Sequence, residues 1–294
     1  LKSLCEFGAD HPVIYDVAVP ADQLLTVLPE IPLGSPVLLQ KPMGENIEQA
    51  RQILEICRER NFQAAVNFQL RFAPFILAAQ SLLESGQLGD LCDLEFRISV
   101  FTPWHLWDFL QGIPRMEILY HSIDYIDAIR SFLGDPSGIY AQTLAHPNSP
   151  GLTNTRSTIL LDYGNSIRAT ISTNHNHCFG DRHQESSIKW EGSRGAMKAK
   201  MGLLLNYPEG KPDSFEYNLL DSKGNAGSWE SIPLPGSWFP HAFMGTMASL
   251  MRYVQGETDH LPTSVEDAYR TMACVESAYQ SSDRGGYPID YRAP

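Results

Sequence analysis

The sequence predicts two folding units in succession, an α/β unit with a parallel sheet and an α+β unit with a large, mainly antiparallel open sheet. Up to Arg71, apolar runs of strand length alternate with amphipathic segments of helix length. After Arg71, the expected strands alternate apolar and polar residues, so each has one wet face. The chain has 294 residues, of which 43% are hydrophobic, and is long enough for two cores. We place the units at residues 1–71 and 72–294, with a helix at about 263–282 packed back near the first unit.

The first unit contains three expected strands and two helical segments. Three apolar runs have strand length: PVIYDVAV (12–19), VLLQ (37–40) and FQAAVNF (62–68). Residues 21–34 indicate a short helix and a loop interrupted by two prolines, and a longer helix begins at Gly44 or Asn46. Apolar residues recur in that helix at spacings of three and four, with acids at its start and arginines at its end. Strands that alternate with helices favour a parallel sheet covered on both faces.

The second unit contains longer strands. A helix from Pro74 to Ser85 precedes an alternating strand in DLCDLEFRISVFT (90–102). Further strands are expected in STILLDYGNSIRATIST (157–173), which holds two joined by a turn, in SSIKWEG (186–192) and in GAMKAKMG (195–202). The last helix is SVEDAYRTMACVESAYQSS (264–282), and turn residues follow it.

Composition limits the classes of partner. Lysine and arginine number 22 against 34 acidic residues, a formal charge of −12, which disfavours nucleic acid and acidic membrane surfaces. The five cysteines are odd in number and lack CxxC spacing, so a reducing, cytoplasmic setting is expected. There is no apolar run of membrane-spanning length and no secretory leader, so neither membrane insertion nor secretion is expected.

A lysine ends the second apolar strand, in VLLQKP. Ligands of an open parallel sheet bind beyond the carboxyl ends of its strands, which is where Lys41 falls. Pro42 restricts the backbone of Lys41 and helps to aim its amine. A lone lysine is more often an exposed loop residue, but at a strand end its ammonium can stabilise negative charge on a substrate oxygen. Lys41 is therefore a candidate catalytic group.

A predicted helix carries an acid and a histidine four residues apart, in RMEILYHSIDYIDAIRSFLGDP (115–136). On a regular α-helix Glu117 and His121 are neighbours on one face, so the carboxylate can hold and polarise the imidazole. This pair suits a general base. The alternative is a pair on a solvated helix, where this spacing is also common.

The segment TNHNHCFGDRH (173–183) concentrates polar side chains. Five of them are potential metal ligands: His175, His177, Cys178, Asp181 and His183. The chain has no matching CxxC or HExxH, so a loop that contacts a polar substrate is favoured over a metal site. Two aromatic stretches, TPWHLWDF (102–109) and GSWFPHAF (236–243), are expected in the core or an interface, although tryptophan can also pack against sugar rings.

Together, several of these segments resemble the glucose-fructose oxidoreductase / inositol dehydrogenase (Gfo/Idh/MocA) family. They are the strand ending in QKP, NFQLRF, SLLESGQLGDL and EILYHSIDYIDAIRSFLG, and the resemblance runs from about Pro12 to about Pro288. It implies that residues 1–71 are the C-terminal part of a Rossmann domain that binds NAD or NADP, and that residues 72–294 bind substrate and form a dimer interface. It also implies oxidation or reduction of a secondary alcohol on a sugar, inositol or related polyol, in a homodimer or a dimer of dimers.

The resemblance assigns roles by motif. The family's strand-end motif, Glu-Lys-Pro, maps onto Gln40, Lys41 and Pro42 and places them at the cofactor; because glutamine is uncharged, Lys41 is expected to lack a neighbouring carboxylate. An aspartate four residues before a histidine maps onto Glu117 and His121. The implied mechanism has His121 take the hydroxyl proton, Glu117 orient His121, and Lys41 stabilise the alkoxide. Substrate contacts are expected from Asn174, His175 and His177. These roles require that Lys41 and His121 converge on one cleft.

The family's glycine-rich cofactor turn has no counterpart in this sequence. A GxGxxG pattern occurs nowhere, and the residues before Pro12 are too few for the first βαβ units of a Rossmann domain, so we expect the native polypeptide to be longer. A relative that binds a sugar-like ligand or partner without turnover is therefore the alternative function. A hydrolase or isomerase with a metal at His175, His177 and His183 is a more distant one.

Overall fold

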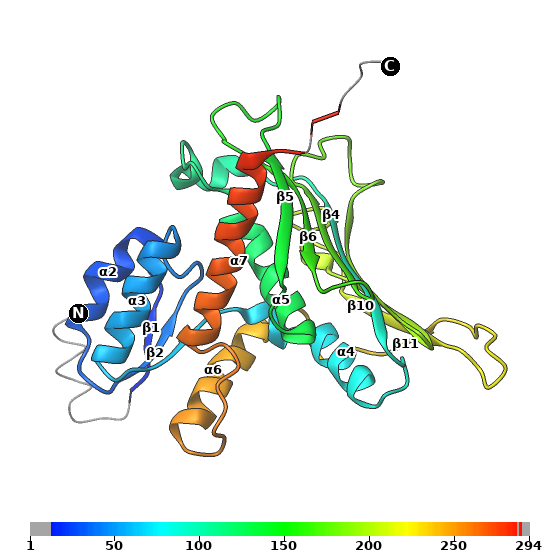
Figure 1. The fold of residues 1–294 in the computed structure, drawn as a ribbon, viewed down its shortest axis with the longest axis horizontal. Coiled ribbons are helices and arrows are strands. Elements are labelled where there is room, and N and C mark those ends of the chain that lie inside the picture. The colour runs from blue at the N-terminus through cyan, green and yellow to red at the C-terminus, as the bar shows by residue number, and fades with distance from the viewer. Residues whose placement is uncertain (1–12, 287, 290–294) are drawn as a thin grey trace.

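The protein is described by a computed structural model that covers residues 13–286, 288 and 289. The first twelve residues of the predicted first unit, and the last five residues of the second, lie outside this description. Two sheets organise the described chain, one of three strands and one of eight (Figure 1). This confirms the predicted combination of a small parallel sheet with a large, mainly antiparallel one.

The small sheet is parallel and has the strand order β1-β2-β3. Its strands are β1 (Tyr15–Val17), β2 (Pro36–Leu39) and β3 (Gln63–Val66). The chain between β1 and β2 forms short helical turns at Ala21–Gln23, Leu24–Val27 (α2) and Leu28–Glu30. Between β2 and β3 lies α3 (Ile47–Glu59), whose first turn is capped because the side chain of Asn46 accepts a hydrogen bond from the Gln49 amide.

Helices cover both faces of the small sheet, as the near-continuous apolar strands require. Val37 and Leu39 of β2 pack in the main core with Ile53 of α3. Leu38, between them in the strand, faces the opposite way and packs with Leu250 of α6 (His241–Val254). Helix α6 was not predicted from the sequence.

The large sheet has the order β11-β10-β9-β8-β4-β7-β6-β5, and only the β4–β7 pair within it is parallel. Its strands are β4 (Leu91–Ser99), β5 (Gly138–Leu144), β6 (Arg156–Asp162), β7 (Arg168–Asn174), β8 (Glu185–Gly192), β9 (Gly195–Lys200), β10 (Ser214–Leu219) and β11 (Glu230–Ser231). Helix α4 (Pro74–Glu84) precedes it. The sequence did not predict β5, β10 or β11.

Two helices join the small sheet to the large one. A π-helical turn, Ile118–Ser122, leads into α5 (Ile123–Leu133), and the terminal helix α7 (Val265–Arg284) packs against α3, α5 and β5 (Figure 1). The Ser281 and Ser282 hydroxyls accept hydrogen bonds from backbone amides of β5. Among the described helices, none combines the length and the apolar character needed to cross a bilayer.

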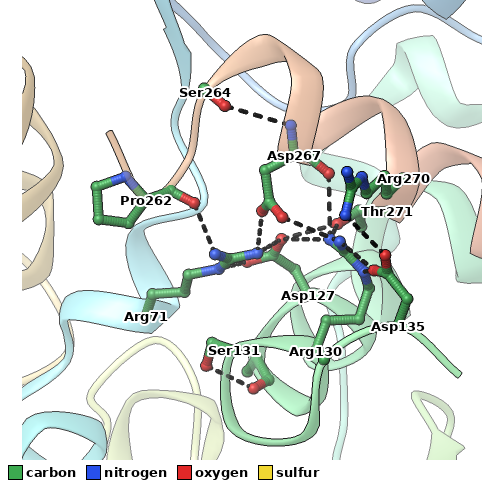
Figure 2. Close-up of polar contacts among 12 residues, drawn as sticks. Arg71, Asp127, Arg130, Ser131, Asp135, Pro262, Ser264, Asp267, Arg270 and Thr271 are labelled. Atoms are coloured by element: carbon green, nitrogen blue, oxygen red, sulfur yellow. Dashed lines mark hydrogen bonds and ion pairs between the residues drawn. The ribbon is translucent and has the colours of Figure 1, made fainter. Parts of the chain in front are cut away.

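A buried ionic cluster fixes α5 and α7 to the turn after β3 (Figure 2). Arg71 donates two hydrogen bonds to the carboxylate of Asp127 on α5, at 2.6 and 2.7 Å, and one to the backbone carbonyl of Pro262 at 2.7 Å. Arg130, also on α5, contacts Asp267 and Thr271 of α7. Because α5 follows directly from the turn that holds His121, this ionic cluster sets where that histidine lies.

Candidate active site

A cavity of about 410 Å³ opens beyond the carboxyl ends of β2 and β3 and is closed by residues of the large-sheet part of the chain. Its polar lining includes Gln40, Lys41, Asn67, His121, Asp124 and His175. Lys41 and His121, 80 residues apart in the sequence, thus line one cavity, and Pro42, the third residue of the strand-end motif, is buried and lies outside this lining. A larger cavity of about 790 Å³ borders the ionic cluster, where Arg71 and Arg130 already pair with Asp127 and Asp267.

Lys41 follows β2 and is held by two acceptors. Its Nζ donates a hydrogen bond to the backbone carbonyl of Tyr120 at 2.6 Å and lies 2.8 Å from Oδ2 of Asp124. Burial raises the pKa of the Asp124 carboxyl, and the charge of Lys41 opposes that rise. The expectation that Lys41 lacks a neighbouring carboxylate is therefore wrong, because α5 supplies Asp124 in place of the family's strand-end glutamate. The peptide bond between Lys41 and Pro42 is cis.

Gln40 joins the ends of the three parallel strands. Its Nε2 donates to Oδ1 of Asp16 at 2.9 Å, and its Oε1 accepts from Nδ2 of Asn67 at 2.9 Å. The amide suits this position because it can donate on one side and accept on the other, which a carboxylate cannot do. Oδ1 of Asn67 and Oε1 of Gln69 are buried and have no protein partner among the described residues.

The expected contact between Glu117 and His121 does not form in the described structure. The buried carboxylate of Glu117 instead accepts hydrogen bonds from the Ser122 hydroxyl, at 2.8 Å, and pairs with Nε2 of His175 at 3.3 Å. The reason is the π-helical turn at Ile118–Ser122, in which residues five apart, rather than four, come into alignment. The role of Glu117 as the group that orients His121 by direct contact is thus a wrong prediction.

His121 is packed by rings. The ring centroid of His175 lies 4.7 Å from that of His121, and Trp104 makes edge contacts with both imidazoles at 5.4 and 5.7 Å. Nε2 of His121 is buried and has no partner among the described residues. Burial lowers the pKa of His121 well below its ordinary value, and the charges of His175 and Lys41 lower it further. A neutral imidazole is the form that can accept a proton.

The expected substrate loop contributes one of its three residues to the cavity. His175 lines it, whereas Asn174 and His177 are not among the lining residues. Oδ1 of Asn174 accepts the amide of Asn176, and the His177 ring packs on Phe179. Asp181 of the same loop pairs with Lys211. No group of three potential metal ligands occurs within the described ranges of the chain.

The two aromatic stretches both reach the cavity. Trp107, Trp238, Phe239 and Phe243 belong to its lining, together with Tyr207. Nε1 of Trp238 is buried and finds no acceptor in the described part of the protein. The expected core packing is confirmed, because Trp104 and Trp238 are buried core residues and Trp107 packs against the cluster around Trp104. Trp107 and Trp238 also border the cavity.

Comparison with known proteins places the chain among oxidoreductases. No family model matches it. The chain is 26% identical over 261 residues to D-apiose dehydrogenase of Rhizobium rhizogenes, an alignment that covers 85% of this chain and 71% of that protein. An oxidoreductase from Agrobacterium radiobacter, solved with NAD+, L-tartaric acid and magnesium, superposes with a TM-score of 0.73 at 20% identity, over 95% of this chain and 80% of the other.

A second solved structure shares the fold. The WlbA dehydrogenase of Bordetella pertussis, in complex with NADH and UDP-GlcNAcA, matches with a TM-score of 0.69 at 17% identity and covers 98% of this chain and 83% of its own. At these identities the structural matches establish the shared fold. The sequence match to D-apiose dehydrogenase shows, in addition, that the chain is similar in sequence to a dehydrogenase.

Proposed function

Because the chain belongs to the Gfo/Idh/MocA-like family of oxidoreductases, we propose that it is an NAD(P)-dependent dehydrogenase that transfers a hydride between nicotinamide and a secondary alcohol or ketone of an uncharged sugar or polyol. The observation that carries this proposal is the convergence of a held lysine and an unpaired histidine on one cavity at the carboxyl ends of parallel strands.

His121 is the proposed general base. Its lowered pKa keeps it neutral at pH 7, so in the oxidation direction it can take the proton of the substrate hydroxyl, and it returns that proton in reduction. Its ring packs against Trp104 and His175, and its Nε2, which has no partner among the described residues, is the nitrogen that would bond the substrate.

Lys41 is the proposed electrostatic group. An ammonium has three N–H donors, and Tyr120 and Asp124 engage two of those of Lys41. The third donor is left for the substrate oxygen, where it stabilises the negative charge that develops as the hydroxyl loses its proton. Asp124 acts by holding the amine in place.

The described residues fit the nicotinamide end of the cofactor. Gln40, Lys41 and Asn67 would hold it, and the buried, unpartnered Oδ1 of Asn67 matches the amide donor that a carboxamide offers. When bound, the cofactor supplies the carbon that exchanges hydride.

The lining favours an uncharged substrate with an apolar ring face. Lys41 is the one lysine or arginine among the lining residues of the described cavity, and Asp124 already pairs with it. No free cation is left there for a carboxylate or phosphate. Trp107 and Trp238 border the cavity, where an indole could pack against the C–H side of a sugar ring, and Oε1 of Gln69 has no partner among the described residues and could accept a hydroxyl.

The test is a spectrophotometric screen at 340 nm for nicotinamide reduction, with neutral aldoses, ketoses and cyclitols against sugar acids, each with NAD+ and NADP+. We expect turnover only with neutral compounds. Lys41→Met and His121→Asn should each reduce kcat at least 100-fold, whereas the exposed Lys198→Met and His105→Asn should leave it unchanged. Full activity in either site variant would remove that residue from the mechanism.

Ligand binding without turnover, the alternative function, is tested with the same protein in a thermal-shift assay. Stabilisation by a neutral sugar together with no stabilisation by NAD(H) or NADP(H) would support binding alone and defeat the dehydrogenase proposal.

A further inference from the structure

We infer that Asp213 is a positioning residue that joins the two segments forming the apolar wall of the cavity, and so sets the shape in which a substrate is bound. The consequence for substrate binding rests on the proposed function, but the link itself does not. Asp213 stands directly before β10 and is not among the residues that line the cavity. It therefore acts on the site only through the segments that it holds.

The apolar wall consists of aliphatic and aromatic side chains from two segments, 202–207 and 236–243. Six lining residues of the cavity belong to these segments: Leu203, Leu204, Tyr207, Trp238, Phe239 and Phe243. The polar lining, which includes Lys41 and His121, comes from other parts of the chain. The wall thus bears on how a substrate is bound, whereas proton transfer is assigned to the polar side.

Each oxygen of the Asp213 carboxylate holds one of the two segments. Oδ1 accepts a hydrogen bond from the backbone amide of Gly202 at 2.6 Å, and Oδ2 accepts one from the backbone amide of Trp238, also at 2.6 Å. Hydrogen bonds to an ionised acceptor are shorter and stronger than neutral ones. Among the described residues, no hydrogen bond joins the two segments directly. The carboxylate is therefore the polar link between the two halves of the wall.

The backbone beside Asp213 is closely packed. The carbonyl oxygen of Gly202 accepts the amide of Lys211 at 2.9 Å, which closes the loop 202–211 at its base. A Cβ at Gly202 would lie 1.8 Å from the carbonyl oxygen of Lys211, so a side chain has no room there. Asp213 follows two residues after this closure, and its carboxylate is thus carried to one place against the Gly202 amide.

Both segments also have anchors of their own. Trp238 is 5% exposed and Leu205 is 6% exposed, and both side chains belong to the main core, as does Ala242 of α6. Loss of the Asp213 carboxylate should therefore leave the fold intact. What it should loosen is the placement of one half of the wall relative to the other.

Hydrogen exchange followed by mass spectrometry tests the link in the purified protein, without substrate or cofactor. Asp213→Asn keeps the shape, but its amide can accept only one of the two N–H groups and turns an NH₂ donor toward the other. We expect exchange in peptides from 202–207 and 236–243 to accelerate together, by about 10-fold or more. Asp221→Asn is the matched control at the other end of β10, because Asp221 accepts the amides of Lys223 and Asn225 in an exposed turn that does not line the cavity. It should leave both segments unchanged.

Steady-state kinetics with a substrate from the screen at 340 nm tests the consequence. In Asp213→Asn, KM should rise about 10-fold while kcat stays within about twofold, because Lys41 and His121 are held by other segments. A residue that merely stabilises the fold would lower the active fraction, and hence the apparent kcat, without raising KM. A fall in kcat at unchanged KM, or faster exchange in only one segment, would overturn the inference.

If Asp213→Asn fails to fold, the unaltered protein decides. The amides of Gly202 and Trp238 should both exchange slowly in NMR spectra, and rapid exchange of either contradicts the link. Hydrogen exchange needs no turnover, so an inactive protein in which the two segments loosen together would defeat the proposed function and support the link. An active protein in which neither exchange nor KM responds to Asp213→Asn would do the reverse.

Discussion

Replacing Arg71 by methionine should destabilise the protein strongly, because it leaves the buried carboxylate of Asp127 without its main cation (Figure 2). Removing one partner of a buried ion pair costs about 3–5 kcal/mol. The loss should fall near the lower end, about 3 kcal/mol, because Asp127 keeps the Thr271 hydroxyl at 2.8 Å and Arg130 at 3.9 Å. The backbone carbonyl of Pro262 also loses its donor.

The free energy of unfolding is measured by urea denaturation followed by circular dichroism. Arg51→Met is the matched control, since Arg51 pairs with Glu48 on the exposed surface of α3 and should change stability little. The effect of Arg71→Met should also depend on pH. Burial raises the pKa of Asp127 and Arg71 opposes this rise, so without Arg71 the folded carboxyl binds its proton at still higher pH. The folded state then binds more protons than the unfolded state, and the loss of stability should be smaller at pH 5 than at pH 8.

The double variant Arg71→Met/Asp127→Asn sharpens this test. If the loss comes from an uncompensated charge, removing that charge should recover part of it at pH 8. Equal losses in Arg71→Met and Arg51→Met, or a loss that grows toward acid pH, would refute the reasoning.

Three further predictions concern the site. Gln40→Glu restores the family's motif but places a second carboxylate next to Oδ1 of Asp16, so the free energy of unfolding should fall by about 0.5–1 kcal/mol in thermal denaturation. Adding Asp16→Asn should recover this loss. A Gln40→Glu protein more stable than the unaltered one would contradict the prediction. Because the pKa of His121 is lowered in the folded state, the unfolded state binds more protons as the pH falls through about 6.5, and the free energy of unfolding should decline there. In urea unfolding between pH 7 and pH 5, His121→Asn should make this decline shallower. A decline as steep as that of the unaltered protein would contradict the prediction. Asp124→Asn keeps the shape but releases Lys41 from its ion pair, so kcat should fall roughly 10- to 100-fold with little change in Tm; unaltered kcat would show that Lys41 is held otherwise.

The regular part of the fold could be predicted because its patterns are local. The apolar runs that became β2 and β3, and the helix that begins after Asn46, have periods that depend on neighbouring residues alone. Helix α6 was missed because its sequence, HAFMGTMASLMRYV, follows an aromatic stretch that suggested packing rather than a helix start. The parallel pairing of β4 with β7 joins segments about 75 residues apart, and no local pattern specifies it.

The site could be predicted only in part. Lys41 is readable because a strand end is a local feature, and His121 because the family resemblance marks it. The contact of Lys41 with Asp124 spans 83 residues, although Asp124 lies on the same helical stripe as His121 and could have been suspected there. The pairing of Glu117 with His175 could not, because the spacing rule for an α-helix fails inside a π-helical turn.

That π-helical turn lets one helical segment direct side chains toward two places that a regular α-helix could not reach together. Before the turn, Glu117 must point to the loop after β7; beyond it, Asp124 and Asp127 must point to Lys41 and Arg71. A π-bulge accommodates a surplus residue within an otherwise α-helical segment. Deleting one residue of the turn would therefore change the direction of Glu117, while α5 and the ionic cluster that it carries keep their positions. The site chemistry and the ionic cluster can thus change independently of each other.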